Sequence, residues 1–275
     1  PKAKQLLEPF GRISAAAVAA ACLACTDDDL ILILPADHDI RDIAAFHAAI
    51  NAAAETAMKE SIVTFGIEPT HPATEYGYIR AASALNGVAL DVEEFVEKPD
   101  LKTAKSYINQ GGYFWNAGIF LFQACVMREA LRTHAPDVLV GTQSAMTSPS
   151  SQKIHLSSDA FAKTPSVSID YAVMEKATNI KTVPVSMGWS DVGGYRALHA
   201  LMTNKPEENY ESGPVFVDNS EGLYVRTEGP TVAVNGVSNL AIVATKNEVM
   251  VTSTRDESAA KLLGAAVQSP RPTVR

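Results

Sequence analysis

Apolar and polar residues along the first 200 positions fall into blocks that fit strands and helices in turn. Residues 30–34, at the start of "LILILPADHDI", form an unbroken apolar run, and residues 61–67, "SIVTFGI", have a similar character. Such runs are typical of strands buried on both faces in the middle of a parallel sheet. Residues 15–25 and 42–59 carry alanine-rich patterns that predict helices.

Further segments continue this alternation. Aromatic and β-branched residues predict strands over 76–82, 92–99, 113–122 and 180–187, and helical patterns cover 101–112, 123–134 and 168–177. Gly111 and Gly112 predict a glycine C-cap for the helix over 101–112. Strands that alternate with helices favour an α/β domain with a mostly parallel, twisted sheet.

The pattern changes at residues 202–214, a polar segment with two prolines. Short strand candidates follow, and a helical pattern returns only at 256–267; the strand candidates read "VFVD", "LYVRT", "TVAVNG", "LAIVAT" and "VMVTS". We therefore predict a core domain over residues 1–205 and a small β-rich region over 206–275. The spacing of these short strands is too irregular to indicate a repeat.

Composition narrows the classes of partner. The chain has 275 residues, 47% of them hydrophobic, and 31 acidic against 23 basic residues give a formal net charge of −8. This balance argues against binding of nucleic acid or an anionic membrane surface. No apolar run approaches the roughly 18 residues of a transmembrane helix. A phosphate-bearing ligand would need a metal ion, a few cations or backbone amides.

Three cysteines do not form a disulfide framework. Cys22 and Cys25 make a C-x-x-C, which would suit a zinc or redox site, but they lie in an alanine-rich helical run without a second pair. Two thiols packed in a helix are the favoured interpretation. We expect a reducing, cytoplasmic compartment, and the N-terminal segment lacks the pattern of a signal peptide.

Two isolated aspartates follow buried strands. Asp37 comes directly after the apolar run and Pro35, and Asp191 follows the strand predicted over 180–187, next to Gly193 and Gly194. Ligands of α/β sheets bind outside the carboxyl ends of the strands, and Mg²⁺ is commonly held by one or two carboxylates plus phosphates. We expect these two aspartates to share one Mg²⁺. The alternative is that each is only a helix cap, a role that Asp39, Asp42 or Ser190 would fill equally well.

Polar residues also interrupt two aromatic-rich strands. Glu97 and Lys98 precede Pro99, where a turn would let both side chains enter one cleft, with Glu97 accepting from sugar hydroxyls and Lys98 placed near a phosphate. Asn116 has donors and an acceptor for a sugar hydroxyl, and Gly118 permits close approach of a ligand. The alternatives are two solvated edge charges and a strand bulge with a satisfied Asn.

The order of the motifs resembles the bacterial mannose-1-phosphate guanylyltransferases, members of the sugar-nucleotidyltransferase superfamily with a Rossmann-like α/β core. The resemblance runs from Leu6 to about Leu201 and rests on "LLEPFGR", "LPADH", "FGIEPTHPATEYGYI", "FVEKP", "WNAGIF", "SIDYAVMEK" and "VPVSMGWSDVGG". It implies transfer of GMP from GTP to mannose 1-phosphate, which gives GDP-mannose and pyrophosphate.

The resemblance also implies roles for individual residues. Asp37 and Asp191 correspond to metal ligands with catalytic roles. Glu97, Lys98 and Asn116 correspond to residues that contact the sugar or its phosphate, with Lys98 also catalytic. Gly118 is expected in the same sugar pocket. Tyr76, Gly77 and Tyr78 correspond to a segment that lines the sugar pocket. Gly11, Arg12, Pro35 and Asp37 correspond to residues beside the nucleotide. His38 is expected to support a neighbouring ligand or to be structural rather than to act as an acid or base.

The sequence departs from the family pattern in three places. The glycine-rich G-x-G-x-R loop that wraps the triphosphate does not occur, Ile13 replaces the usual Asn, and Glu75 replaces the usual Gly. We therefore expect either a core that lacks its first strand and this loop, or a non-catalytic relative that binds sugar phosphates or regulates a partner. A related enzyme with another sugar or nucleotide is a third hypothesis. The β-rich region is expected to serve as a homodimer contact or to dock on the core.

Overall fold

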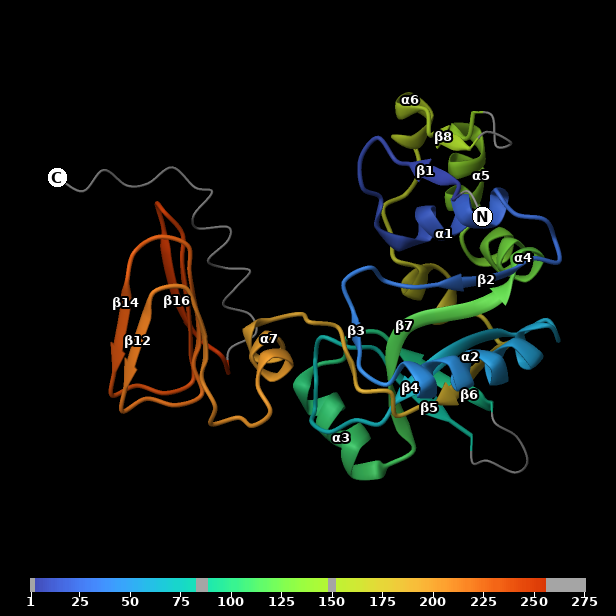
Figure 1. The fold of residues 1–275 in the computed structure, drawn as a ribbon. Coiled ribbons are helices and arrows are strands. Elements are labelled where there is room, and N and C mark those ends of the chain that lie inside the picture. Colours follow the sequence, from blue (N-terminus) through green and yellow to red (C-terminus); the bar gives the residue numbers. More distant parts are fainter. Residues whose placement is uncertain (1–2, 83–88, 148–151, 256–275) are drawn as a thin grey trace. The chain divides into compact units, whose positions relative to one another are not determined.

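The structure is a computed structural model that describes residues 3–82, 89–147 and 152–255. The helices are α1 (Ile13–Leu23), α2 (Ile43–Ala57), α3 (Leu101–Gln110), α4 (Ala124–His134), α5 (Pro136–Ala145), α6 (Ser158–Phe161), the π-helix η1 (Asp170–Met174) and α7 (Tyr195–Met202) (Figure 1). The helix expected over 256–267 lies outside the described residues.

The strands of the first 190 residues build the main sheet and two short pairings. They are β1 (Gln5–Leu7), β2 (Leu30–Ile33), β3 (Asp39–Ile40), β4 (Ile62–Ile67), β5 (Tyr78–Ala81), β6 (Leu90–Val96), β7 (Tyr113–Gln123), β8 (Lys153–His155), β9 (Ile180–Pro184) and β10 (Trp189–Ser190). Six of them form one sheet in the order β2-β7-β4-β9-β6-β5, and β5 also pairs with β7. The short pairings join β1 with β8 and β3 with β10. The α/β class expected from the sequence is confirmed.

The prediction of a mostly parallel sheet is wrong, because this sheet is mixed. Among its pairings in the described part of the chain, β4–β9 is parallel and the others are antiparallel. Parallel neighbours need a long crossover, usually through a helix, whereas direct connections give antiparallel pairs. No described helix lies between β4, β5 and β6, and the alternation of strands and helices that favours a parallel sheet fails there.

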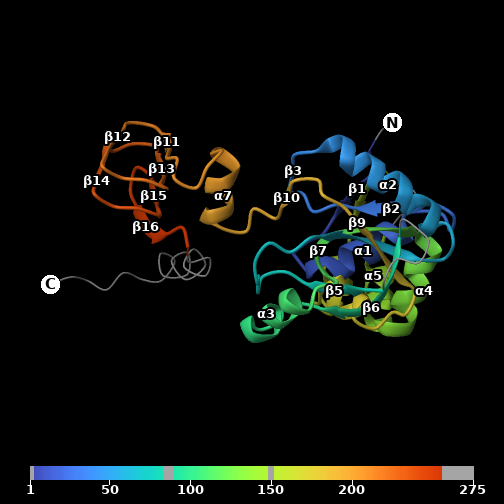
Figure 2. The same ribbon diagram turned by 90° about the horizontal axis from the view of Figure 1, so that it is seen from below.

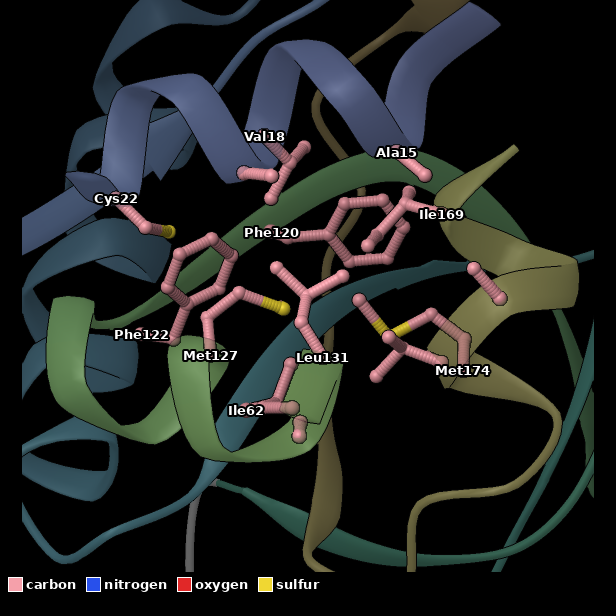
Figure 3. Packing of buried hydrophobic residues seen from close by; sticks show 14 of the residues in the cluster. Ala15, Val18, Cys22, Ile62, Phe120, Phe122, Met127, Leu131, Ile169 and Met174 are labelled. Atoms are coloured by element: carbon pink, nitrogen blue, oxygen red, sulfur yellow. The ribbon is translucent and has the colours of Figure 1, made fainter. Parts of the chain in front are cut away.

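Helices cover both faces of the sheet (Figure 2). Alternate residues of β7 explain this arrangement: Phe120 and Phe122 pack in the cluster of α1 and α4, whereas Ile119 and Leu121 pack in the cluster of α2. Figure 3 shows the first cluster, in which Val18 of α1 lies over Phe122 and the side chains of α4. The core therefore forms on both sides of β7 and β4.

The expected central position of the first apolar strand is also wrong. β2 pairs with β7 and forms one edge of the described sheet, and Leu30 and Leu34 are exposed. Its two faces nonetheless pack as expected, because Ile31 and Ile33 contact the α1 cluster and Leu32 contacts the α2 cluster. An apolar run reports what covers the faces of a strand, but not what pairs with its edge.

Local signals at helix ends are confirmed. Asp42 is the N-cap of α2, where its Oδ1 accepts from the Ala45 N–H at 2.8 Å. Gly111 is the C-cap of α3, with a φ of 70° that a glycine adopts without steric cost. These two caps fix where α2 and α3 begin and end.

The chain divides into two compact units, one of residues 1–36 and 40–189 and the other of residues 37–39 and 190–275. The boundary predicted from the sequence lies between residues 205 and 206. The second unit holds α7 and the strands β11 (Tyr210–Ser212), β12 (Val215–Asp218), β13 (Tyr224–Thr227), β14 (Val232–Asn235), β15 (Leu240–Ala244) and β16 (Val249–Ser253).

The β-rich region has a regular construction that the sequence analysis missed. β11, β13 and β15 pair in parallel, as do β12 and β14, so that successive segments stack as the coils of a short β-helix. Tyr210 lies opposite Tyr224, and Tyr224 lies opposite Ala241. Equivalent positions are therefore unequally spaced along the chain, which hides the repeat from a search at a fixed period.

The cysteines are all free. Cys22 is buried in α1, and burial raises the pKa of its thiol to about 12, while Cys25 and Cys125 are half-buried. The described residues contain no group of three or more His, Cys, Asp or Glu side chains that could hold a metal ion. Nor does any helix in the described ranges have the length and apolar character needed to cross a bilayer.

Candidate functional site

Strand pairing brings Gly77, Glu97 and Asn116 together in the first unit. Tyr78 lies opposite Val96 on β6 and opposite Trp115 on β7, so the residues next to these pairs become neighbours. The Asn116 N–H donates to the Gly77 carbonyl at 2.8 Å. A Cβ on Gly77 would lie 2.5 Å from Oε2 of Glu97 and 3.4 Å from Cβ of Asn116. A side chain at residue 77 would therefore force the Glu97 carboxylate to move away from its present position.

The turn after β6 joins the two charged ends of Glu97 and Lys98, as the sequence indicates. β6 ends at Val96, and Lys98 has a φ of 49°, in the left-handed region. Its Nζ lies 3.5 Å from Oε1 of Glu97. The Lys98 side chain is 58% exposed and that of Glu97 only 10%, so they are not two solvated edge charges. Lys98 can meet an incoming anion while Glu97 stays largely shielded from water.

Glu97 lies in an environment that disfavours its charged form. Burial raises the pKa of the Glu97 carboxyl to about 7, the nearby Asp170 carboxyl raises it too, and Lys98 lowers it. Glu175 contributes a hydrogen bond at the same place, because its Oε1 accepts from the Glu97 N–H at 3.1 Å. Near neutral pH this carboxyl therefore exists in both protonation states.

Asn116 lies at a bulge of β7 and is largely satisfied by the protein. Its Oδ1 accepts from the Thr64 hydroxyl at 2.8 Å and from the Gly118 N–H at 3.2 Å, and its Nδ2 donates to Oδ1 of Asp170 at 3.1 Å. The register of β4 and β7 shifts between Thr64 and Gly66, and Gly118 has a φ of 67°. These contacts fit the bulge interpretation, and they leave one Nδ2 hydrogen for a ligand.

The two tyrosines of the Y-G-Y segment have different surroundings. The Tyr76 ring is half-buried, 5.0 Å from the Trp115 ring and 5.2 Å from the Trp189 ring. Tyr78 is fully buried, and its ring lies 5.4 Å from that of Tyr107. The Tyr76 ring therefore packs against two tryptophans, whereas Tyr78 belongs to the core.

A hollow of about 410 Å³ opens beside Tyr76, at the carboxyl ends of the parallel strands β4 and β9. Its lining includes Ile67, Glu68, Thr70, Trp115 and Trp189. This is the edge of the sheet at which α/β proteins bind ligands. A larger hollow of about 790 Å³ lies at the opposite ends of these strands, next to Glu60 and Asn179. None of the predicted site residues lines either hollow; Tyr76 adjoins the smaller one through the rings of Trp115 and Trp189.

The loop before α1 is bound to α6. The Arg12 guanidinium donates to the Ala162 carbonyl at 2.5 Å and lies 5.0 Å over the Phe10 ring, while the space around Gly11 is open. Pro35 is half-buried in the turn between β2 and β3. The contacts of Arg12 thus describe a structural role for a residue predicted to lie beside the nucleotide.

The predicted metal ligands Asp37 and Asp191 both belong to the second unit. Burial lowers the pKa of the His38 imidazole, whereas the carboxylates of Asp37 and Asp191 both raise it. Both acidic groups are therefore close enough to one side chain to affect its charge. The lowered pKa favours the neutral ring, and the role of His38 stays a prediction.

Neither aspartate caps a helix. Asp42 caps α2, and α7 begins after Gly194 without a side-chain cap. Oδ1 of Asp191 instead accepts from the Gly193 N–H at 3.1 Å within its own turn, and a Cβ on Gly193 would lie 2.7 Å from Oδ2 of Asp191. Both carboxylates act on the same His38 ring, and carboxylates are ligands that Mg²⁺ takes together with oxygens from phosphates and water.

Sequence reasoning missed Asp170, Glu175 and Thr64 as parts of the site in the first unit. Asp170 and Glu175 lie in "SIDYAVMEK", and Asp170 opens the π-helix η1. The available signal was a carboxylate within an otherwise apolar segment, since such groups are seldom buried without a partner. Thr64, in the middle of a buried strand, gave no signal.

Comparison with known proteins agrees with this fold. Residues 2–208 match the family described as Nucleotidyl transferase. The chain is 41% identical over 257 residues to the mannose-1-phosphate guanylyltransferase ManC of Salmonella typhimurium, with 90% of this chain and 54% of that protein aligned. It is 43% identical over 251 residues to the xanthan biosynthesis protein XanB of Xanthomonas campestris pv. campestris, with 90% and 53% aligned. The chain thus spans about half the length of the curated relatives it matches.

Solved structures give the same result. A crystal structure described as mannose-1-phosphate geranyltransferase from Thermus thermophilus superimposes with a TM-score of 0.83 at 33% identity, over 96% of this chain and 77% of that one. A second, described as mannose-6-phosphate isomerase from Helicobacter pylori, gives a TM-score of 0.62 at 34% identity, over 67% of this chain and 74% of that one. Because the family match also covers well over half of the chain, the chain belongs to the nucleotidyl transferase family.

Proposed function

We propose that this chain carries out the guanylyl transfer of a mannose-1-phosphate guanylyltransferase, in which GTP and mannose 1-phosphate give GDP-mannose and pyrophosphate. The observation that carries the proposal is the pairing of Glu97 and Lys98 against the bare backbone of Gly77, next to the Asn116 carboxamide. A shielded carboxyl, an exposed ammonium and an amide suit the hydroxyls and the phosphate of a sugar phosphate. The names of the relatives support mannose as the sugar.

The reaction needs no protein nucleophile. A phosphate oxygen of mannose 1-phosphate forms a bond to the α-phosphorus of GTP, and the bond from that phosphorus to the pyrophosphate oxygen breaks in line. Lys98 holds the attacking phosphate, and Glu97 and Asn116 hold the sugar hydroxyls. The protein contributes mainly by orienting two anions and neutralising their charge.

Asp37 and Asp191 are the residues that would hold Mg²⁺ in this proposal. When bound, the ion supplies charge neutralisation at the phosphates. His38 lies beside both carboxylates, and its lowered pKa keeps the ring neutral, so it does not compete with the ion by carrying a positive charge. Gly11, Arg12 and Pro35 remain proposed nucleotide contacts on the strength of the resemblance alone.

The direct test follows pyrophosphate release from GTP, Mg²⁺ and mannose 1-phosphate. We expect turnover by the protein, and a loss of at least about 100-fold in kcat for Asp191→Ala, because removal of one of two carboxylate ligands leaves the ion poorly held. Asp159→Ala, at an exposed acid in α6, is the matched control and should retain full activity. EDTA should abolish the reaction, and excess Mg²⁺ should restore it.

Two outcomes would count against the proposal. Full activity of Asp191→Ala would remove Asp191 from the metal site. Binding of mannose 1-phosphate without any pyrophosphate release would favour instead a non-catalytic protein that binds sugar phosphates. Calorimetric titration with mannose 1-phosphate, in the absence of GTP, separates this case from an inactive preparation.

A homodimer through the β-rich region is part of the proposal. Val249 and Val251 are exposed on β16, which forms one edge of the four-stranded β11-β13-β15-β16 sheet, and Phe216 on β12 is exposed too. Apolar side chains at an open edge favour pairing with another chain. Light scattering should show a dimer for the wild type and a monomer for Val251→Lys.

We also expect the protein to work in the reducing cytoplasm.

A further inference from the structure

Asp170 lies behind Asn116 and beside Glu97, in a motif that the proposed reaction leaves without a role. It opens η1, whose following residues Ala172, Val173 and Met174 are buried in the core of the first unit. The Ile169 N–H donates to the Ser14 hydroxyl at 2.8 Å, which ties the start of η1 to α1. π-Helical turns occur frequently at functional sites. The Asp170 side chain therefore starts from a firmly anchored backbone.

The contact with Asp170 decides which way the Asn116 carboxamide faces. Oδ1 of Asn116 receives two donors, the Thr64 hydroxyl and the Gly118 N–H, and Nδ2 faces Oδ1 of Asp170 at 3.1 Å. A flipped amide would place its oxygen against the Asp170 carboxylate, an acceptor against an acceptor, and its Nδ2 against the Gly118 N–H, a donor against a donor. Asp170 and the Gly118 N–H thus select the same orientation, and Asp170 is the side chain that does so.

The charges around Glu97 are unbalanced. The acidic groups acting on it are Asp170 and Glu175, and Lys98 is the cation paired with it, at 3.5 Å. Burial also raises the pKa of the Asp170 carboxyl, while hydrogen bonds from Asn116 and Ser168 lower it. Three carboxyls near one lysine retain a proton more readily than an isolated carboxyl does.

We propose that Asp170 is a positioning residue of the sugar pocket: it fixes the Asn116 carboxamide in one orientation and lets the neighbouring Glu97 carboxyl carry a proton that it donates to a sugar hydroxyl. This inference rests on the proposed function, because it takes the ligand to be a hexose 1-phosphate. The proton comes from solvent and is not consumed in the transfer. Glu97 then acts as donor and acceptor, which distinguishes a hydroxyl from a purely anionic group.

The test uses Asp170→Asn, which keeps the shape and removes the charge, and Asp170→Ala, which removes both. Asp159→Asn is the control. In ligand-free protein, NMR follows the Asn116 side-chain amide and the titration of the Glu97 carboxyl. We expect Asp170→Asn to lower the Glu97 midpoint below about 7, although burial, the larger cause, still holds it above the ordinary value of 4.5. Asp170→Ala should also speed exchange of the Asn116 amide hydrogens.

Kinetics give a second, independent measurement. We expect Asp170→Ala to raise KM for mannose 1-phosphate about tenfold, in line with the loss of one hydrogen bond to a charged group, and to change kcat and KM for GTP less than about threefold. KM for mannose 1-phosphate should increase at a lower pH in Asp170→Asn than in the wild type. A structural defect would instead change all three parameters together.

The outcomes separate the two proposals. If the wild-type protein neither binds nor converts mannose 1-phosphate, the proposed function fails, and the ligand-free NMR still decides the role of Asp170. If the Asn116 signals and the Glu97 midpoint of Asp170→Asn and Asp170→Ala equal those of the wild type, the positioning role is wrong whatever the substrate. Should Asp170→Ala fail to fold, the midpoint in Asp170→Asn decides.

Discussion

At the scale of single residues, the site combines groups that are costly to hold. Glu97 is a shielded carboxyl with a raised pKa. Lys98, which follows it, has a φ of 49°, and Val192, which follows Asp191, has a φ of 52°. For a β-branched residue such as Val192, this left-handed conformation is strained. Strained backbone concentrates at functional sites, where the surrounding structure holds it in place.

The raised pKa of Glu97 predicts how stability varies with pH. The folded protein favours the protonated carboxyl, so this contribution to stability is fully present below the ordinary value of 4.5 and is lost as pH rises through about 7. Glu97→Gln removes the effect. We therefore expect the free energy of unfolding of the variant, relative to that of the wild type, to increase by about 3 kcal/mol from pH 4 to pH 8.

Urea unfolding at four pH values measures this difference. Glu93→Gln is the matched control, because the Glu93 side chain is 47% exposed on the same strand, and its difference from the wild type should stay constant. A constant difference for Glu97→Gln as well would show that the carboxyl titrates alike in the folded and unfolded chains.

At the scale of elements, the start of α1 shows the same kind of strain. Arg12 is its N-cap without a side-chain hydrogen bond, and Ile13 has a φ of 60° and is 59% exposed. Asn tolerates this conformation much better than a β-branched residue does. The departure from the family pattern at Ile13 therefore has a local cost that is independent of nucleotide binding.

We expect Ile13→Asn to stabilise the protein by about 1 kcal/mol, because it relieves the strain and exposes no buried surface. The shift of the urea midpoint measures this gain. Ile13→Val keeps the branched Cβ and should give none. Equal stability of the two variants would mean that the backbone at residue 13 relaxes at no cost.

Elements with strong local signals could be predicted from the sequence, and their arrangement could not. The helices with side-chain or glycine caps, α2 and α3, lie within two residues of their predicted ends. The central position of β2 and the direction of its neighbours were predicted wrongly, because pairing depends on distant segments. The β-helix escaped for the same reason, since unequal spacing hides which strands stack.

The site followed a similar rule. Glu97 and Asp191, which follow strands, and Asn116, which interrupts one, could be proposed from sequence. Asp170 is marked only as a carboxylate in an apolar segment, and its contact across 54 residues to Asn116 could not be predicted. A buried hydrogen bond between remote segments leaves no local pattern.

At the scale of the whole molecule, each of the two units has its own core. Leu223, Val225, Val234 and Ile242 pack together within the β-helix, whereas the larger clusters lie in the first unit. Both tryptophans of the chain, Trp115 and Trp189, belong to the first unit. Tryptophan fluorescence therefore reports on one unit alone.

We expect Leu223→Ala to destabilise the second unit by about 2–5 kcal/mol, since Leu223 is fully buried. The midpoint temperature of the unfolding transition that circular dichroism assigns to β-structure should decrease. The midpoint temperature followed by tryptophan fluorescence should stay unchanged. Phe122→Ala, at a fully buried position of β7, should do the reverse. If both transitions move together in either variant, the units unfold as one.

The edge position of β2 has a consequence for handling this chain. Within the described residues, its outer row of backbone N–H and C=O groups meets no strand, and the side chains along it are leucine and isoleucine. Such an edge is a template for adding β-structure from other molecules. Concentrated samples should thus tend to assemble into thioflavin-positive fibrils, and Leu30→Lys, at an exposed position of this strand, should suppress their growth.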